Sequence, residues 1–260
     1  MQTDYKKLTE HYLSSYGEQN RFQLDQMHHI EYITTMRYLL KYLPKGCTVL
    51  DCCAGGGAYA FSLAKEGYKV IAGDLIKEHT DILNEKNKNG LLEMVYQGNV
   101  LNMSLFANES FDAVLCMGAL YHLLELKERE KCVAECLRIL KNGGIFAFAY
   151  LNRNAARFNN LFDSKYSVHE LSEKIKTGIS GAFYFMDFDE ATKLVSKYTV
   201  EKITEIGVDG LAYSHILKPR LNQATPEEFA YYMEYHLETC EQPLIIGHSM
   251  HVLWIGRKTR

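Results

Sequence analysis

The sequence predicts an α/β fold in which parallel strands are joined by crossover helices. From residue 46 onward, short apolar or β-branched runs alternate with helix-length segments, and glycine-bearing turns separate them. This alternation is typical of βαβ units. A chain of 260 residues, 47% of them hydrophobic, is long enough to bury a sizeable core. We therefore expect one large domain or a domain with an appended cap.

The expected elements follow one another in a regular order. Strands are expected at residues 48–52, 69–73, 92–97, 111–117 and 145–151. Helices are expected between them, over 57–66, 76–88 and 126–140. Gly67 and Gly90 follow the first two helices, and Asn142-Gly143-Gly144 is expected to stop the third. Two more strands, at 200–206 and 251–257, flank a helix with Thr225 as N-cap and Pro226 at its first position, and are expected to form a hairpin-like edge.

Two segments stand outside this order. Residues 1–45 are expected to form an N-terminal helical cap segment, and residues 46–260 the main domain. An insert at about 152–188, after the fifth strand, is expected to form a second cap. Aromatic side chains bury a large area, so packing is the expected role of most tyrosines in the first segment. They are Tyr5, Tyr12, Tyr16, Tyr32, Tyr38 and Tyr42.

Composition excludes several classes of protein. The formal net charge is -3, so no overall basic field favours nucleic acid. Apolar runs are strand-sized and the amino terminus is polar, so we expect a cytoplasmic protein without a membrane partner. Seven cysteines scattered through apolar segments suit buried thiols in a reducing compartment. Cys132 and Cys136 fall on the apolar stripe of a helix, and since no Cys/His set has the spacing of metal ligands, no metal site is expected.

The most informative stretch is a glycine loop between the first strand and the first helix. Gly55, Gly56 and Gly57 permit positive φ and close approach of a ligand to the positive end of the helix. Asp74 falls at the tip of the second strand, where a carboxylate can accept hydrogen bonds from a ribose diol. Together they indicate a nucleoside site.

Two cofactor classes compete for this loop. Gly55 to Ala60 also satisfies the G-x-G-x-x-A form of dinucleotide enzymes. However, Asp51 ends the first strand, where a buried acid would repel a pyrophosphate and attract a cationic group such as an amino group. The alternative role of Asp51 is to cap the backbone amides of the loop.

In these motifs the sequence resembles the class I S-adenosylmethionine-dependent methyltransferases, in their small-molecule, bacterial, methyltransferase type 11-like branch. The resemblance covers roughly residues 46–151 and the terminal strand. It is carried by Asp51, Gly55 and Gly57 in the D-x-G-x-G-x-G motif, by Asp74, by Gln97-Gly98-Asn99-Val100, and by 111–114, 121–123 and 137–144 in the family's order. Cys53 replaces the first glycine of the motif, and Asn99 replaces a common Asp whose role an amide oxygen can fill.

The resemblance implies a fold and a cofactor. The fold is a Rossmann-like, doubly wound, seven-stranded sheet of order 3-2-1-4-5-7-6 with the last strand antiparallel. The cofactor is S-adenosyl-L-methionine, bound across the carboxyl ends of the strands. The implied cofactor contacts are Tyr16, Arg21, Asp51, Cys53, Ala54, Gly55, Gly57, Asp74, Leu75, Asn99, Val100 and Met117. Tyr16 and Arg21 are expected to close over the cofactor carboxylate, although a surface ion pair is the alternative for Arg21.

Methyl transfer from a sulfonium is an in-line displacement in which positioning dominates. Candidates near the methyl group are Tyr121 and His122, which follow the fourth strand. His122 is the best available general base, and a hydrogen-bonded structural histidine is its alternative role. Tyr121 is expected either to contact the substrate or to pack in a lid. His248 and His251 adjoin the final strand, where edge packing is expected.

The expected acceptor is a small molecule, and the protein a monomer or homodimer. Enzymes of this family that methylate amino groups of nucleic-acid bases carry an Asn/Asp-Pro-Pro-Tyr/Phe box, whereas this chain has Cys116-Met117-Gly118-Ala119. Two other functions stay open. One is a non-catalytic S-adenosylmethionine-binding regulator, and the other is an NAD-dependent oxidoreductase.

Overall fold

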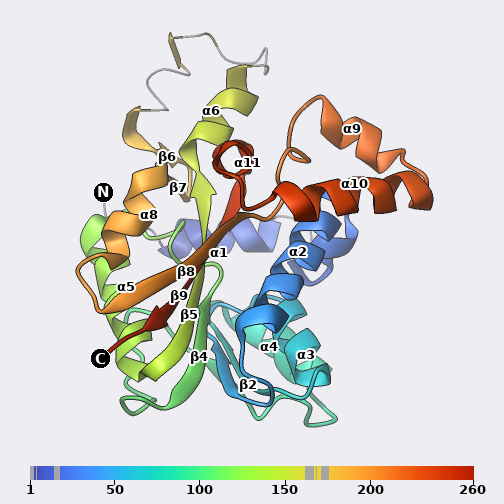
Figure 1. Ribbon diagram of the computed structural model, residues 1–260. Helices are drawn as coiled ribbons and strands as arrows, with labels where there is room; N and C mark the ends of the chain where they lie inside the picture. The colour runs from blue at the N-terminus through green and yellow to red at the C-terminus, as the bar shows by residue number, and fades with distance from the viewer. Residues whose placement is uncertain (1–2, 4, 15–17, 162–166, 168, 171–175) are drawn as a thin grey trace.

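The fold is an open sheet with helices on both faces, as the computed structural model shows (Figure 1). The structure describes residues 1–260 except 1–2, 4, 15–17, 162–166, 168 and 171–175. The main sheet has the order β3-β2-β1-β4-β5-β9-β8. Its strands are β1 (Thr48–Asp51), β2 (Lys69–Asp74), β3 (Met94–Gln97), β4 (Phe111–Cys116), β5 (Leu140–Asn152), β8 (Val200–Gly207) and β9 (His251–Lys258).

This order confirms the fold implied by the family resemblance. Neighbouring strands from β3 to β5 pair in parallel, while β9 lies antiparallel between β5 and β8. The last strand is therefore the antiparallel one, as expected. Leu151 of β5 pairs with His251, so β9 begins at the edge where the parallel strands end.

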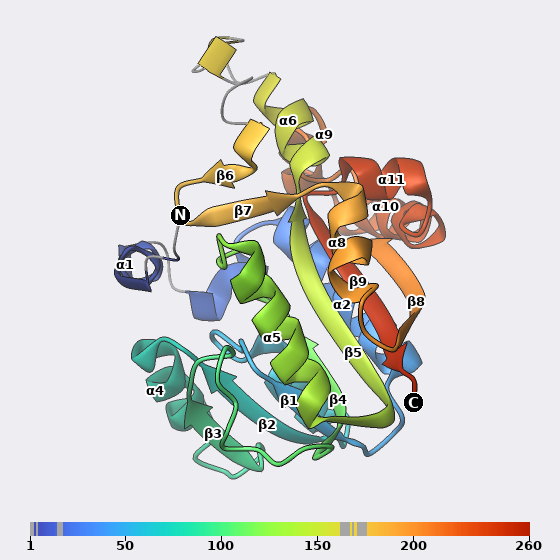
Figure 2. The same ribbon diagram turned by 90° about the vertical axis from the view of Figure 1, so that its left-hand side faces the viewer.

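Two hydrophobic clusters hold the layers together. Neighbouring residues of a strand point to opposite faces, and Val49 accordingly packs in one cluster and Leu50 in the other. The Val49 face carries α2 (Gln26–Tyr42), α3 (Ala58–Lys65) and α4 (Lys77–Lys86). The Leu50 face carries α5 (Leu126–Ile139) and α8 (Phe188–Val195), which cross in front of the sheet in Figure 2.

The remaining elements flank the end of the sheet where the parallel strands stop. The chain begins with α1 (Tyr5–Ser14) and the 3-10 helix η1 (Glu18–Gln23). After β5 come α6 (Arg153–Leu161), β6 (Ile179–Ser180) and β7 (Phe183–Met186). Between β8 and β9 lie α9 (Leu217–Asn222), α10 (Pro226–Thr239) and α11 (Pro243–His248). The Thr225 hydroxyl accepts from the Glu228 amide, so α10 begins with the expected cap.

The helix expected over 126–140 is confirmed as α5, which ends at Ile139. The expected stop signal was placed wrongly, because Leu140 is already extended and pairs with Phe111, so that Asn142-Gly143-Gly144 lies within β5. In the insert after the fifth strand, β7 pairs in parallel with Leu151 and Asn152 of β5 and continues the sheet.

Within the described part of the chain, no helix combines the length and the apolar character needed to cross a membrane.

Candidate active site

A pocket opens where the parallel strands end, and most of the expected cofactor contacts line it. It lies between the segments that follow β1, β2, β3 and β4 on one side and the N-terminal helices on the other. Of the expected residues, the lining includes Arg21, Cys53, Ala54, Gly55, Asp74, Leu75, Asn99, Val100, Met117, Tyr121 and His122. Asp51 and Gly57 lie behind this lining, and Tyr16 lies outside the described residues.

The glycine loop needs glycine for both conformation and space. Gly55 and Gly57 have φ of 51° and 84°, in the left-handed region that other residues rarely adopt. A Cβ on Gly57 would stand 2.5 Å from Leu83 Cδ2, so a larger residue would also require side chains of the neighbouring helices to shift. Gly57 is the N-cap of α3 and supplies no side chain to its first amides, which leaves them available to a ligand.

Asp74 ties this loop to the end of β2. Its two carboxylate oxygens accept from the backbone amides of Gly55 and Ile76, each at 2.9 Å. The Nδ1 atom of His79 lies 3.2 Å from the same carboxylate. Each carboxylate oxygen has a second lone pair, so Asp74 can shape the loop and still accept hydrogen bonds from a diol in the pocket.

Asp51 is a buried acid without a hydrogen-bond partner. It is 1% exposed, and neither carboxylate oxygen has a partner of normal hydrogen-bond geometry among the described residues. Burial raises its pKa to about 7. The nearby Cys53 amide opposes this rise, and repulsion from Asp74 adds to it. Burying a carboxylate without a partner costs free energy unless a cation or a hydrogen-bond donor pairs with it. We call Asp51, residues 52–57 and Asp74 the loop wall.

His122 is held on both sides of its ring. Its Nδ1 atom lies 3.0 Å from the carbonyl oxygen of Ala182, which can only accept, so Nδ1 carries the proton. Burial lowers the pKa of His122 to about 4, so the ring is neutral and Nε2 accepts from the Tyr12 hydroxyl at 2.8 Å. The hydroxyl of the neighbouring Tyr121 donates to the Met117 carbonyl at 3.1 Å.

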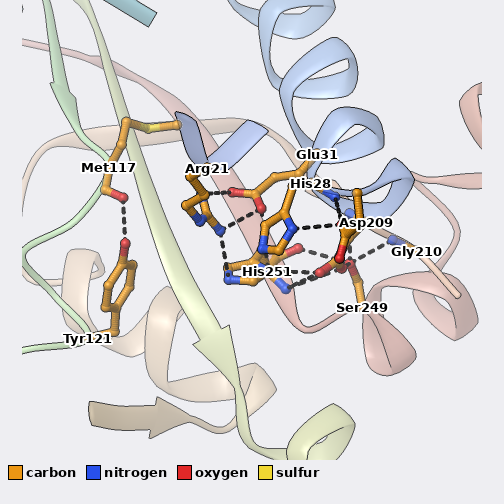
Figure 3. A network of polar contacts seen from close by, with 10 residues as sticks. Arg21, His28, Glu31, Met117, Tyr121, Asp209, Gly210, Ser249 and His251 are labelled. Atoms are coloured by element: carbon orange, nitrogen blue, oxygen red, sulfur yellow. Dashed lines mark hydrogen bonds and ion pairs between the residues drawn. The ribbon is translucent and has the colours of Figure 1, made fainter. Parts of the chain in front are cut away.

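Charged residues gather on another wall of the pocket, where the sequence analysis expected Arg21 but missed Glu31 and Asp209. Arg21 and Glu31 form a two-point ion pair, with N···O distances of 2.9 and 2.6 Å (Figure 3). Arg21 also contacts Nε2 of His251, at 3.3 Å. Nδ1 of His251 lies 2.8 Å from a carboxylate oxygen of the fully buried Asp209. We call Arg21, Glu31, Asp209 and His251 the polar wall.

The protonation of the polar wall follows from its geometry. A carboxylate accepts and a guanidinium donates, so Nδ1 of His251 carries a proton and Nε2 accepts from Arg21. Burial alone would lower the pKa of His251, but Glu31 and Asp209 outweigh it and raise that pKa. Burial would likewise raise the pKa of Glu31, but Arg21 and His251 hold it below its ordinary value. The contact with Arg21 thus suits a neutral imidazole, whereas the raised pKa of His251 favours its protonated form.

Two expectations change with this wall. Edge packing was the wrong expectation for His251, because this residue lines the pocket while its strand completes the sheet. Arg21 forms an ion pair with Glu31, but the pair is not on the surface, because the Arg21 side chain is 16% exposed and the Glu31 side chain 8%. One signal could have found His251: an antiparallel last strand must begin at the edge where the parallel strands end.

Residues near the amino terminus cover the pocket. Thr3, Tyr5, Leu8 and Tyr12 all line it. The Thr3 hydroxyl donates to Glu128 at 2.6 Å and accepts from the Leu124 amide at 3.1 Å, which fixes this segment to the start of α5. The cover is therefore attached by polar contacts at its edge.

Comparison with known proteins identifies the central part of the chain. Residues 50–148 match the family described as "Methyltransferase domain". The ubiquinone biosynthesis O-methyltransferase of Dinoroseobacter shibae is 27% identical over 165 residues, which are 63% of this chain and 64% of the relative. The chain thus matches less than two thirds of that protein.

Solved structures share the fold. The PH0226 protein of Pyrococcus horikoshii superimposes with a TM-score of 0.63 at 18% identity, covering 96% of this chain and 99% of that one. A chain described as an S-adenosylmethionine-dependent methyltransferase from Methanosarcina mazei gives a TM-score of 0.59 at 18% identity, covering 85% and 97%. At these identities the likeness concerns the fold alone.

Proposed function

We propose, from the premise that this chain belongs to the class I S-adenosylmethionine-dependent methyltransferases, that it methylates a hydroxyl oxygen of a small aromatic molecule. The observation that carries the proposal is the His251–Asp209 pair, which opens on the same pocket as the glycine loop. The relative from Dinoroseobacter shibae, by its name an O-methyltransferase of ubiquinone biosynthesis, supports an oxygen acceptor.

The residues of the loop wall fit S-adenosylmethionine. Asp51 offers an uncompensated buried carboxylate to the amino group of the cofactor, directly or through water. Asp74 offers acceptors to the ribose, and Asn99 lies in the pocket lining on the side expected for the adenine. When bound, the cofactor supplies a methyl group made electrophilic by a sulfonium.

In this proposal, the polar wall and the segment from Thr3 to Tyr12 carry out the rest of the reaction. Nε2 of His251 accepts the hydroxyl proton of the acceptor after Arg21 has turned away, and the acceptor oxygen then carries the charge that attacks. Asp209 keeps its hydrogen bond to Nδ1 and stabilises the resulting imidazolium. Such general-base catalysis contributes typically about 10²–10⁴-fold. The segment of Thr3 to Tyr12 excludes water and holds the acceptor in line, and alignment of this kind is worth about 7–11 kcal/mol.

His122 and Tyr121 have supporting roles in this proposal. Both ring nitrogens of His122 are engaged, and its lowered pKa makes it a weak proton acceptor at neutral pH. We propose that His122 positions Tyr12 by accepting a hydrogen bond from its hydroxyl group. Tyr121 faces the same pocket and is proposed to contact the acceptor ring.

The proposal is tested in two steps. Calorimetry with S-adenosylmethionine and its demethylated product measures cofactor binding. A screen of phenols and catechols with mass detection then looks for a gain of one methyl group. Binding of the cofactor without methylation of any hydroxyl would favour the regulator instead, and tight binding of NAD(H) without S-adenosylmethionine would favour the oxidoreductase.

A further inference from the structure

Five of the seven cysteines converge beside the pocket, and the proposed methyl transfer uses none of their thiols. Cys52 and Cys53 follow β1, Cys116 ends β4, and Cys132 and Cys136 lie one turn apart on α5. Their sulfur atoms form two triads that share Cys116, and within each triad all sulfurs lie within 4.8 Å of one another. The outer triad is Cys52, Cys53 and Cys116, and the inner triad is Cys116, Cys132 and Cys136.

One sulfur separation in each triad is close to that of a three-thiolate metal site, and the others are below 4.8 Å. A cation about 2.3 Å from each sulfur holds neighbouring sulfurs about 3.8–4.0 Å apart. The Sγ atoms of Cys52 and Cys53 are 3.9 Å apart, and those of Cys116 and Cys132 are 3.6 Å apart. All five thiols are free, so none is tied up in a disulfide. Little movement is therefore needed to bring three sulfurs around one ion.

The surroundings hold these sulfurs in place. The Cys52 thiol donates to the Leu115 carbonyl at 3.1 Å, and Cys116 is fully buried at the end of a central strand. A triad made of sulfur alone is a soft donor set, which selects thiophilic d¹⁰ cations over the hard cations Mg²⁺ and Ca²⁺. Preorganisation and donor type therefore point to the same class of ligand.

We propose that the outer triad binds one soft d¹⁰ cation of the class of Cu⁺ and Cd²⁺. As each sulfur–metal bond forms, the S–H bond of that thiol breaks and its proton passes to the solvent, with no change of oxidation state. The outer triad is chosen because Cys52 and Cys53 line the pocket and Cys53 is partly exposed, whereas all three members of the inner triad are buried. An ion can thus reach the outer triad through the pocket.

The first experiment titrates the reduced, full-length protein with Cd²⁺. The expected result is one tightly bound ion per chain, an ultraviolet thiolate-to-cadmium charge-transfer band that saturates at one equivalent, and release of up to three protons. Proton release requires the apparent affinity to rise with pH. Absence of the band, or a band that grows without saturation, would overturn the proposal.

Single substitutions then locate the ion. Cys53→Ser should weaken Cd²⁺ binding at least tenfold, whereas Cys132→Ser and the control Cys47→Ser, which lies outside both triads, should retain the band at one equivalent. Loss of the band in Cys132→Ser with retention in Cys53→Ser would place the ion in the inner triad and overturn the assignment. Thermal unfolding verifies that each variant is folded. If Cys53→Ser does not fold, Cys53→Ala is used in its place.

A third measurement tests the access route. If the ion enters through the pocket, saturating S-adenosylhomocysteine should slow Cd²⁺ uptake several-fold in stopped-flow absorbance without changing the stoichiometry. Equal rates in a protein that calorimetry shows to bind S-adenosylhomocysteine would refute the route. A protein that does not bind that compound refutes the proposed function instead, and the cadmium stoichiometry still decides the metal site.

Discussion

The two walls of the pocket are built in opposite ways. The loop wall comes from one continuous stretch of chain, residues 51–57, together with Asp74 at the end of the next strand. The polar wall brings together residues from η1, α2, the segment after β8 and the start of β9. One wall is therefore local in the sequence, and the other exists only in the folded protein.

The walls differ also in how their charges are balanced. Among the residues that the structure describes, Asp51 has no hydrogen-bond partner, and its pKa is raised. The Glu31 and Asp209 carboxylates both have partners, and Asp209 also contacts Ser249, whose hydroxyl accepts from the Gly210 amide (Figure 3). The loop wall thus contains an unpaired acid, whereas the acids of the polar wall are paired within the protein. Substitutions in the two walls should therefore change different quantities.

The largest expected effect is on turnover. His251→Asn removes the proposed proton acceptor of the polar wall and should lower kcat by about 10²–10⁴-fold while leaving cofactor affinity within a few-fold. Steady-state kinetics with a phenol that the protein methylates and calorimetry with S-adenosylhomocysteine measure the two quantities. His248→Asn, on α11 and outside the pocket lining, is the matched control. An equal loss of kcat in both variants would remove His251 from the proposed mechanism.

Next in size is an effect on stability. Glu31→Ala leaves Arg21 largely buried without its two-point partner and should lower the free energy of unfolding by about 3–5 kcal/mol. Asp81→Ala breaks the exposed Lys77–Asp81 pair and should change it by less than about 0.5 kcal/mol. Urea unfolding of both variants provides the comparison. Similar values for the two would mean that the polar wall is not preassembled.

Asp51→Asn should stabilise the cofactor-free protein and weaken cofactor binding. The pKa of Asp51 is about 7 in the fold against an ordinary value of 3.8, so the folded state binds the proton more tightly and loses stability as pH rises from about 4 to about 7. The asparagine variant lacks this loss and should gain about 1–4 kcal/mol at pH 8, with no gain at pH 4. Thermal unfolding at the two pH values measures it.

Measuring cofactor affinity shows whether the stability gained in Asp51→Asn comes at the expense of ligand binding. S-adenosylmethionine should bind more weakly to Asp51→Asn than to the native protein, because the carboxylate that meets its amino group is gone. A variant that is more stable and binds equally well would show that Asp51 has no ligand to complete it.

The smallest expected effect is at Asp74. Asp74→Ala should weaken S-adenosylmethionine binding by about 1–3 kcal/mol, because the ribose hydroxyls lose a charged partner and Gly55 and Ile76 lose their acceptor. Titration calorimetry gives the value. Unchanged affinity would mean that the ribose lies elsewhere.

The loop wall was predictable from sequence because its signals are local. Gly55 and Gly57 were expected to have positive φ, and both do. Asp51 and Asp74 were expected at the ends of strands, and they end β1 and β2. The sheet order also agreed, but this expectation came from the family resemblance, whereas the alternation of elements predicts only parallel strands with crossover helices. The extent of α5 was also predictable, but the glycines after it were misassigned, because Leu140 already pairs with Phe111 and the glycines lie within β5.

The polar wall and the thiol cluster could not be predicted in the same way. Glu31 sits within a helix whose sequence shows nothing unusual, and its partner Arg21 lies on a separate short helix. The spacing of Cys52, Cys116 and Cys132 in the sequence matches no metal motif. The sulfurs of Cys52 and Cys132 each come close to that of Cys116 only because β1, β4 and α5 pack together. Such long-range proximity becomes visible only when the register of the strands is known.

The position of β9 has a consequence for how the protein forms during synthesis. β9 is translated after both strands between which it lies. Until it emerges from the ribosome, β5 and β8 each present an open edge, and open edges are prone to pair with other chains. The nascent protein therefore acquires His251 and closes both of these edges in a single late step.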